Sequence, residues 1–199
     1  MWALVEDNTI VKIINRPKGM VINDIRYSKK IFELWTKSEL EAVGIYEIVF
    51  DNTNKQDSDY YNNTDYSFNY ADGEVTASYG IATAKELSDT NATNPEDGTP
   101  ILENGKQVIN KGLKTLKKEY VKKQASHLLE QTDWYNHKAL DDDTFTIPAK
   151  IKTYRASVRA KSNEMETAID NAIDVDALCD LYTYTDGERP LGEFPILEE

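Results

Sequence analysis

The sequence is poor in the residues that most often carry chemistry. One cysteine and two histidines stand among 199 residues. A single cysteine excludes a disulfide within the chain and is compatible with a reducing compartment. Cys179, His127 and His137 also lack the spacing of a zinc site. We therefore expect neither a metal nor a cofactor.

The sequence motifs of common enzymes are missing as well. No glycine-rich phosphate loop, no Gly-x-Ser-x-Gly and no His-Glu-x-x-His occurs. Acidic residues are so abundant that an arbitrary pair of carboxylates is no sign of an acid and a base. The run Asp141–Asp143 lacks the glycine and glutamate positions of an EF-hand loop and predicts an exposed acidic loop. The chain is therefore predicted not to be an enzyme.

Long apolar runs are absent too. No stretch reaches the roughly 18 apolar residues of a transmembrane helix, and residues 1–7 lack the layout of a signal peptide. The formal net charge of −12 opposes binding to nucleic acid or to an anionic membrane. We expect the lysines at 106–123 to lie on a solvated helix face, where they meet the chain's own acidic half or an acidic partner.

Residues 1–87 predict a β-rich domain with one short helix. Apolar runs at Trp2–Val5 and Thr9–Ile14 predict a β-hairpin around a short acidic turn. Ile45–Phe50 predicts a further strand. Tyr66–Ala84 alternates around Asp72-Gly73, which is typical of a second hairpin. The capping-box spacing at Thr36–Glu39 begins the short helix, and Gly44 ends it.

Tyrosines are concentrated in this half of the chain. Tyr61, Tyr66 and Tyr70 are candidates for binding, because a tyrosine buries a large area at an interface and keeps a polar group. The alternative is that aromatic residues simply suit strands.

Residues 88–104 have the composition of a polar linker, with Pro95, Gly98 and Pro100 among Asn, Asp and Thr. Residues 1–103 contain nine basic and eighteen acidic residues, and residues 104–199 contain fourteen basic and seventeen acidic residues. This asymmetry favours two domains. Residues 184–199 carry prolines and predict an extended tail that lies over a surface or reaches a neighbouring molecule.

Residues 105–183 predict an antiparallel helical hairpin. The first helix is expected from Lys106 to Glu130, on the helical spacing of its apolar residues. The second is expected to start near Pro148 and to bury Tyr154. Trp134 is expected to fold back between the helices, so that Trp134→Ala would cost about 3–5 kcal/mol.

Arg155 and Arg159 are four residues apart on the second predicted helix and therefore share one face. They either pair with the Asp141–Asp143 loop or face an acidic partner. Together, these features predict an α+β protein in which an N-terminal antiparallel β-rich domain precedes a C-terminal helical hairpin.

One segment resembles a known family. Leu128-Leu129-Glu130-Gln131-Thr132-Asp133-Trp134, then Pro148 and Tyr154-Arg155-Ala156-Ser157-Val158-Arg159, resembles the C-terminal segment of phage tail assembly chaperones. Those proteins typically show Leu-Leu-x-x-Thr-Asp-Trp and then Tyr-Arg-x-x-Leu-Arg. The opening Trp2–Asn8 hairpin and the helix ending at Val43–Tyr46 are similar to small tail-fibre-associated proteins.

The resemblance implies a non-enzymatic bacteriophage tail protein that binds tail or tail-fibre components. It would be a structural part of the virion tail or fibre junction, or an assembly chaperone in the host cytoplasm, and could form a homo-oligomer. The alternative function is a glycan-binding module that uses the aromatic β region. The predicted partner-binding residues are Trp134, Tyr154, Arg155, Arg159, Tyr61, Tyr66 and Tyr70.

Overall fold

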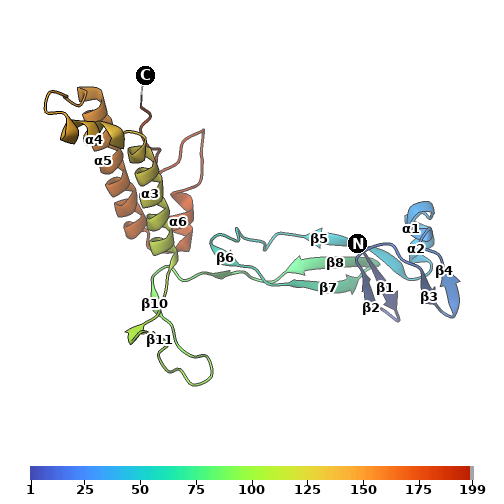
Figure 1. Ribbon diagram of the computed structural model, residues 1–199. Coiled ribbons are helices and arrows are strands. Elements are labelled where there is room, and N and C mark those ends of the chain that lie inside the picture. The colour runs from blue at the N-terminus through green and yellow to red at the C-terminus, as the bar shows by residue number, and fades with distance from the viewer. Residues whose placement is uncertain (198–199) are drawn as a thin grey trace. The chain divides into compact units, whose positions relative to one another are not determined.

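The computed structural model describes residues 1–197 and divides into two compact units (Figure 1). The first unit covers Met1–Thr83, and the second begins at Ala84. Strands dominate the first unit and helices the second, which confirms the predicted α+β class. The boundary lies four residues before the predicted domain end at residue 87.

The first unit is made of short strands and two short helices. Its strands are β1 (Trp2–Glu6), β2 (Thr9–Ile14), β3 (Met20–Ile22), β4 (Ile25–Tyr27), β5 (Ile45–Asp51), β6 (Tyr61–Asn62), β7 (Tyr66–Ala71) and β8 (Glu74–Tyr79). The short strand β9 (Thr83–Ala84) pairs with β6 and includes the boundary between the units. The helices of the first unit are α1 (Ile31–Leu34) and α2 (Lys37–Glu41). The sequence predicted α2 alone, because only α2 has a capping box.

Five strands form the main sheet in the order β2-β1-β5-β8-β7. All neighbours are antiparallel except β5 and β8, which are parallel. The predicted antiparallel arrangement therefore needs one correction. The parallel pair arises because the polar segment after β5 leads first to the edge strand β7. The β7–β8 hairpin then places β8 between β7 and β5. The edge strands β2 and β7 also contact each other, so the sheet is curled.

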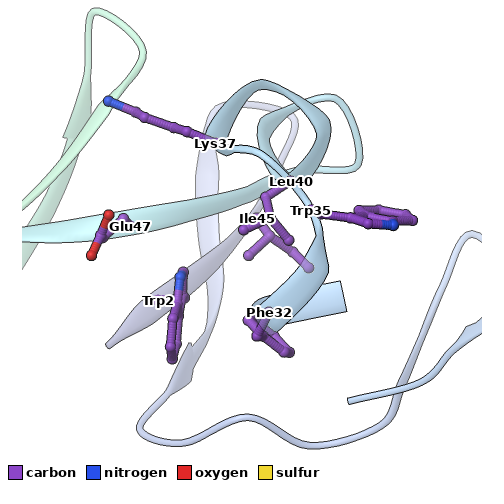
Figure 2. Close-up of a pocket in the computed structure, with 7 residues that line it drawn as sticks. All are labelled: Trp2, Phe32, Trp35, Lys37, Leu40, Ile45 and Glu47. Carbon is purple, nitrogen blue, oxygen red and sulfur yellow. The ribbon is translucent and has the colours of Figure 1, made fainter. Parts of the chain in front are cut away.

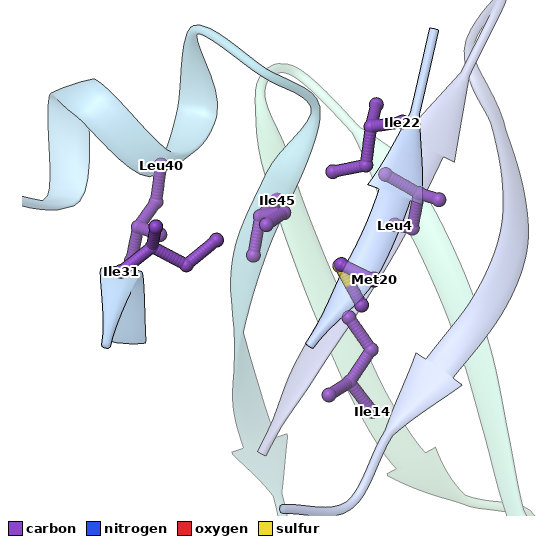
Figure 3. Close-up of a cluster of buried hydrophobic side chains, with 7 residues drawn as sticks. All are labelled: Leu4, Ile14, Met20, Ile22, Ile31, Leu40 and Ile45. Carbon is purple, nitrogen blue, oxygen red and sulfur yellow. The ribbon is translucent and has the colours of Figure 1, made fainter. Parts of the chain in front are cut away.

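The alternation of side chains along the strands gives the sheet two apolar faces. Inside the curl, the buried residues are Ala3, Val5, Ile48, Val75 and Ala77. On the outer face, residues of β1, β2 and β5 pack against α1, α2 and the β3–β4 hairpin (Figure 3). That outer cluster consists of Leu4, Ile14, Met20, Ile22, Ile31, Leu40 and Ile45.

Tight two-residue turns connect the hairpins. Asp7-Asn8, Asn23-Asp24 and Asp72-Gly73 each have positive φ at both positions, as a type I′ turn requires. The hairpins predicted around Asp7-Asn8 and Asp72-Gly73 are thus confirmed.

The capping box of α2 and its glycine stop are also confirmed. Thr36 Oγ1 accepts the Glu39 N–H, and a Glu39 carboxylate oxygen accepts the Thr36 N–H at 2.8 Å. These contacts to Thr36, the backbone one first, lower the pKa of Glu39. Gly44 ends the segment at φ +82°, and a Cβ there would lie 2.6 Å from the Val5 carbonyl oxygen.

The second unit begins with small antiparallel strand pairs in the segment predicted as a linker. They are β10 (Thr90–Asn91) with β13 (Ile109–Asn110), and β11 (Leu102–Glu103) with β12 (Lys106–Gln107). The Gln107 side-chain amide donates to the carbonyl oxygens of Ala92 and Val108, each at 2.8 Å. Residues 88–104 are therefore folded by pairing with residues that follow them.

The helices are α3 (Leu113–Glu130), α4 (Asp133–Asp141), α5 (Ala149–Asn171) and α6 (Val175–Asp180). The predicted helix start at Lys106 is wrong. Asn104-Gly105 forms a hairpin turn that directs residues 106–110 into strands. The chain then passes Gly112, whose N–H donates to Asp89 at 2.8 Å, before α3 begins.

The helices α3 and α5 pack together, as the hairpin prediction required. Three lysines of α3 bond to α5. Lys118 and Lys122 pair with Asp170 and Glu166 at 2.7 and 3.2 Å, and Lys114 donates to the Asp170 carbonyl oxygen. These three lysines thus meet carboxylate and carbonyl oxygens of α5, and not the more acidic half of the chain that the sequence led us to expect.

The C-terminal segment folds back over the hairpin. Leu191 is buried and its N–H donates to the Leu181 carbonyl oxygen at 3.0 Å. Phe194 and Leu197 pack against Ala125, Tyr154 and Val158. The extended tail therefore lies over a surface of its own unit. Residues 198–199 of the predicted tail lie outside the described residues.

Candidate partner-binding surface

Arg155 of α5 forms a buried hydrogen-bonded cluster with the turn between α3 and α4. Its Nη1 donates to the Leu129 carbonyl oxygen and to Thr132 Oγ1, each at 2.7 Å. Its Nη2 lies 2.8 Å from Oδ1 of Asp133. Arg155 is 8% exposed and Thr132 is 1% exposed. The guanidinium therefore joins α5 to the end of α3 and to the start of α4.

The acceptors in this cluster lie at the two helix ends. The Leu129 carbonyl belongs to the last turn of α3 and also accepts the Thr132 N–H and the Thr132 hydroxyl, each at 3.0 Å. Asp133 stands in the first turn of α4, where the helix dipole favours a carboxylate. Asp133 and the two oxygen acceptors compensate the buried charge of Arg155. The residues that carry the family resemblance thus determine the geometry of the turn.

The helix α4 displays aromatic side chains beside this turn. It contains no buried residue, and Trp134 is 52% exposed. The ring centroids of Trp134 and Tyr135 are 3.8 Å apart, and Phe145 lies 6.4 Å from both. Leu140 is 80% exposed on the same helix. We call Trp134, Tyr135 and Phe145 the α4 aromatic surface.

The prediction that Trp134 is buried between the two helices is wrong. The space beside α3 and α5 is filled by Leu128, Leu129, Phe194 and Leu197 instead. Residues 133–141, predicted as a turn and part of a loop, form α4 and hold the tryptophan at the surface. Its predicted loss of 3–5 kcal/mol on truncation therefore no longer applies.

The other helical candidates divide between the inside and the surface. Tyr154 and Arg155 are buried, whereas Arg159 is exposed beside a shallow groove that Lys122 and Asn163 also line. Arg159 Nη1 donates to the Arg155 carbonyl oxygen at 3.4 Å. Arg155 pairs with Asp133 rather than with the predicted acidic loop.

The three candidate tyrosines of the first unit are half-buried. Tyr66 and Tyr70 pack against the cluster inside the curled sheet. The Tyr70 hydroxyl donates to that of Tyr46 at 3.1 Å, and this bond raises the pKa of Tyr46. Tyr61 lies on the short strand β6, also half-buried. These rings do not form one flat exposed platform, and their role in binding stays a prediction.

A pocket that the sequence did not predict lies on the outer face of the sheet (Figure 2). It is lined by Trp2, Phe32, Trp35, Lys37, Leu40, Ile45 and Glu47. Trp2 and Glu47 are direct partners across β1 and β5, so their side chains share a face. The sequence predicted β1 and β5 as strands, but no local pattern indicated that these two strands pair with each other.

Within residues 1–197, no group of three His, Cys, Asp or Glu side chains is placed to hold a metal ion. In that same part of the chain, no helix is both long enough and apolar enough to cross a membrane.

The chain was also compared with known proteins. No family model, no curated protein and no solved structure matches it.

Proposed function

We propose that this chain is a non-enzymatic bacteriophage tail protein that binds a tail or tail-fibre protein through the α4 aromatic surface. The observation that carries the binding role is Trp134, half-exposed against Tyr135 on a helix without a buried residue. The assignment to a phage tail rests on the resemblance of Leu128–Trp134 and Tyr154–Arg159 to tail assembly chaperones.

The composition of the surface suits a protein partner. Tryptophan and tyrosine dominate the energetics of protein interfaces, because they bury a large area and lose few rotamers. Trp134, Tyr135 and Phe145 are adjacent. Lys138 Nζ lies 4.4 Å from the Phe145 ring centroid and gives the surface a polar edge.

The Arg155 cluster supports the same proposal because it fixes the helix that carries the surface. The Asp133 carboxylate, immediately before Trp134, is paired with a guanidinium that is itself buried. A surface held in place before binding loses less conformational freedom when a partner docks. Thr132, Asp133 and Arg155 would then act as positioning residues for Trp134.

Mass spectrometry of gradient-purified phage particles, with copy number relative to a known tail protein, tests the assignment. A stoichiometric signal would identify a structural tail component. Presence in infected-cell lysate but absence from particles would identify an assembly chaperone. A coding sequence that lies outside any phage genome would overturn the assignment to a tail.

Two matched variants test the binding surface. Trp134→Ala should abolish co-purification of the tail or fibre partner from infected cells. Tyr120→Ala on α3 is the control, because Tyr120 is an aromatic residue of similar exposure, at 55%. Equal binding by both variants would exclude the α4 aromatic surface as the docking site.

A further inference from the structure

We propose that the pocket beside Trp2 binds one neutral pyranose ring. This site lies wholly in the first unit and is independent of the α4 aromatic surface. Its cavity is about 230 Å³, below the roughly 300–1,000 Å³ of pockets for drug-sized ligands. The size therefore suits a single ring rather than an extended ligand.

The pocket combines aromatic walls with charged groups. Trp2 and Phe32 stand on one side of Leu40 and Ile45, while the ring of Trp35 lies beyond them (Figure 2). Glu47 follows Ile45 on the same face of β5, two residues along. Lys37 comes from the first turn of α2.

The two charged groups select against a charged ligand. Lys37 and Glu47 have opposite charges, and Glu41 lies 3.7 Å from the Lys37 ammonium, so an anion meets two carboxylates and a cation meets the ammonium. A neutral ligand that both donates and accepts hydrogen bonds can use Lys37 and Glu47 together. A carboxylate accepts from hydroxyls and an ammonium donates to them, so a polyhydroxylated ring satisfies the pair.

Both groups are available for a ligand. Lys37 pairs only loosely with Glu41, at 3.7 Å, and its side chain is 71% exposed. Such an exposed pair contributes little and can be exchanged. Within residues 1–197, no ion pair involves Glu47, which is exposed at the pocket.

The aromatic geometry leaves a ligand the face of a ring rather than the space between the rings. The centroids of Trp2 and Phe32 are 4.8 Å apart with their planes at 54°. The rings already contact each other, so a planar ring cannot be inserted between them. A ligand has to lie against one ring face, and the C–H face of a pyranose provides a matching apolar surface.

Saturation-transfer NMR and calorimetry on the full chain test this site, with the methyl glycosides of glucose, galactose, mannose and N-acetylglucosamine as probes. We expect saturable binding of at least one probe with Kd of about 1 mM. Glu47→Gln and Lys37→Gln should each weaken it at least about fivefold. Glu74→Gln on β8 is the matched control, because Glu74 is an exposed strand glutamate that does not line this pocket.

Three outcomes would overturn the proposal. The first is no binding of any methyl glycoside at about 10 mM, tenfold above the expected Kd. The second is binding of tetramethylammonium or acetate in place of the sugars, which would indicate an ion site. The third is equal weakening by Glu74→Gln. Trp134→Ala should leave sugar binding unchanged, so this proposal and the proposed function fail separately.

Discussion

The guanidinium of Arg155 lies among three oxygen acceptors. It joins α5 to the end of α3 and to the start of α4, the helix that carries Trp134. Arg155 reaches Leu129, Thr132 and Asp133 from one side chain. Removing the guanidinium leaves the buried Thr132 Oγ1 without its donor, which costs about 1–3 kcal/mol, whereas the Asp133 side chain is 42% exposed and can be solvated.

We therefore expect Arg155→Met to lower the free energy of unfolding of the second unit by about 1–3 kcal/mol. Arg159→Met, four residues on and exposed, should change it by less than about 0.5 kcal/mol. Urea denaturation followed by circular dichroism measures both. Similar losses in the two variants would show that the Arg155 contacts do not stabilise the turn.

For Trp134, in contrast to Arg155, we expect a substitution to change stability only a little. Because the side chain is 52% exposed, Trp134→Ala should cost less than about 1.5 kcal/mol, well below the roughly 3–5 kcal/mol of a core tryptophan. The same urea titration checks this value. A core-sized loss would mean that the tryptophan folds inward in solution.

Tyr182 should make the stability of the second unit depend on pH. Burial raises the pKa of Tyr182 from its ordinary 10.0 to about 12, against a smaller lowering by Arg189. Within residues 1–197 its buried hydroxyl has no hydrogen-bond partner. The unfolded chain loses this proton near pH 10 and the folded chain near pH 12. The contribution to stability is therefore complete below pH 10 and is lost as the pH rises from 10 to 12.

Tyr182→Phe removes both the titrating group and the unpaired hydroxyl. We expect an equal or higher melting temperature at pH 7 and a shallower fall in melting temperature between pH 10 and 12. Thermal melts across that range measure the difference. A parallel fall in the variant and the original protein would contradict the assignment to Tyr182.

At the scale of elements, the start of α3 depends on a close approach between backbones. The N–H groups of Leu113 and Lys114 donate to the carbonyl oxygens of Glu86 and Leu87. A Cβ on Gly112 would lie 2.3 Å from the Ser88 carbonyl carbon. The glycine therefore allows residues 86–89 to cover the first turn of the helix.

Gly112→Ala should destabilise the second unit by at least about 2 kcal/mol, because backbone atoms must move to admit the methyl group. Gly80→Ala is the control. There the new Cβ would meet only the side chain of Thr64, at 3.2 Å, so a smaller loss is expected, limited to disturbing the 2.7 Å hydrogen bond from the Gly80 N–H to Thr64 Oγ1. Equal effects in denaturant melts would show that the backbone near Ser88 yields easily.

Local patterns in the sequence predicted the elements that form locally. The Asp72-Gly73 hairpin, the α2 capping box and the α3–α5 pairing all follow from residues close in sequence or from helical period. The parallel β5–β8 pair and the pocket beside Trp2 depend on strands brought together from far apart. Trp134 was misplaced because its burial depends on the distant Phe194 and Leu197, which fill the space instead.

At the scale of the whole molecule, the two units have separate apolar clusters. Leu40 lies in the outer cluster of the first unit, and Val158 in the cluster beneath the C-terminal segment of the second. Leu40→Ala and Val158→Ala should therefore each destabilise one unit, Leu40→Ala by about 2–5 kcal/mol. Hydrogen exchange resolved by segment measures this. Equal loss of protection in both units from one substitution would indicate a single cooperative unit.

The parallel pairing of β5 with β8 has a consequence for the order of folding. The β1–β2, β3–β4 and β7–β8 hairpins close through two-residue turns, and hairpins form in microseconds. β5 pairs with β8 only after the intervening chain has looped back, and such non-local contacts form slowly. During refolding, amides of the β7–β8 hairpin should therefore become protected before those that join β5 to β8. Until that step, β5 and β8 have open edges, so this interval is when the chain is most exposed to aggregation.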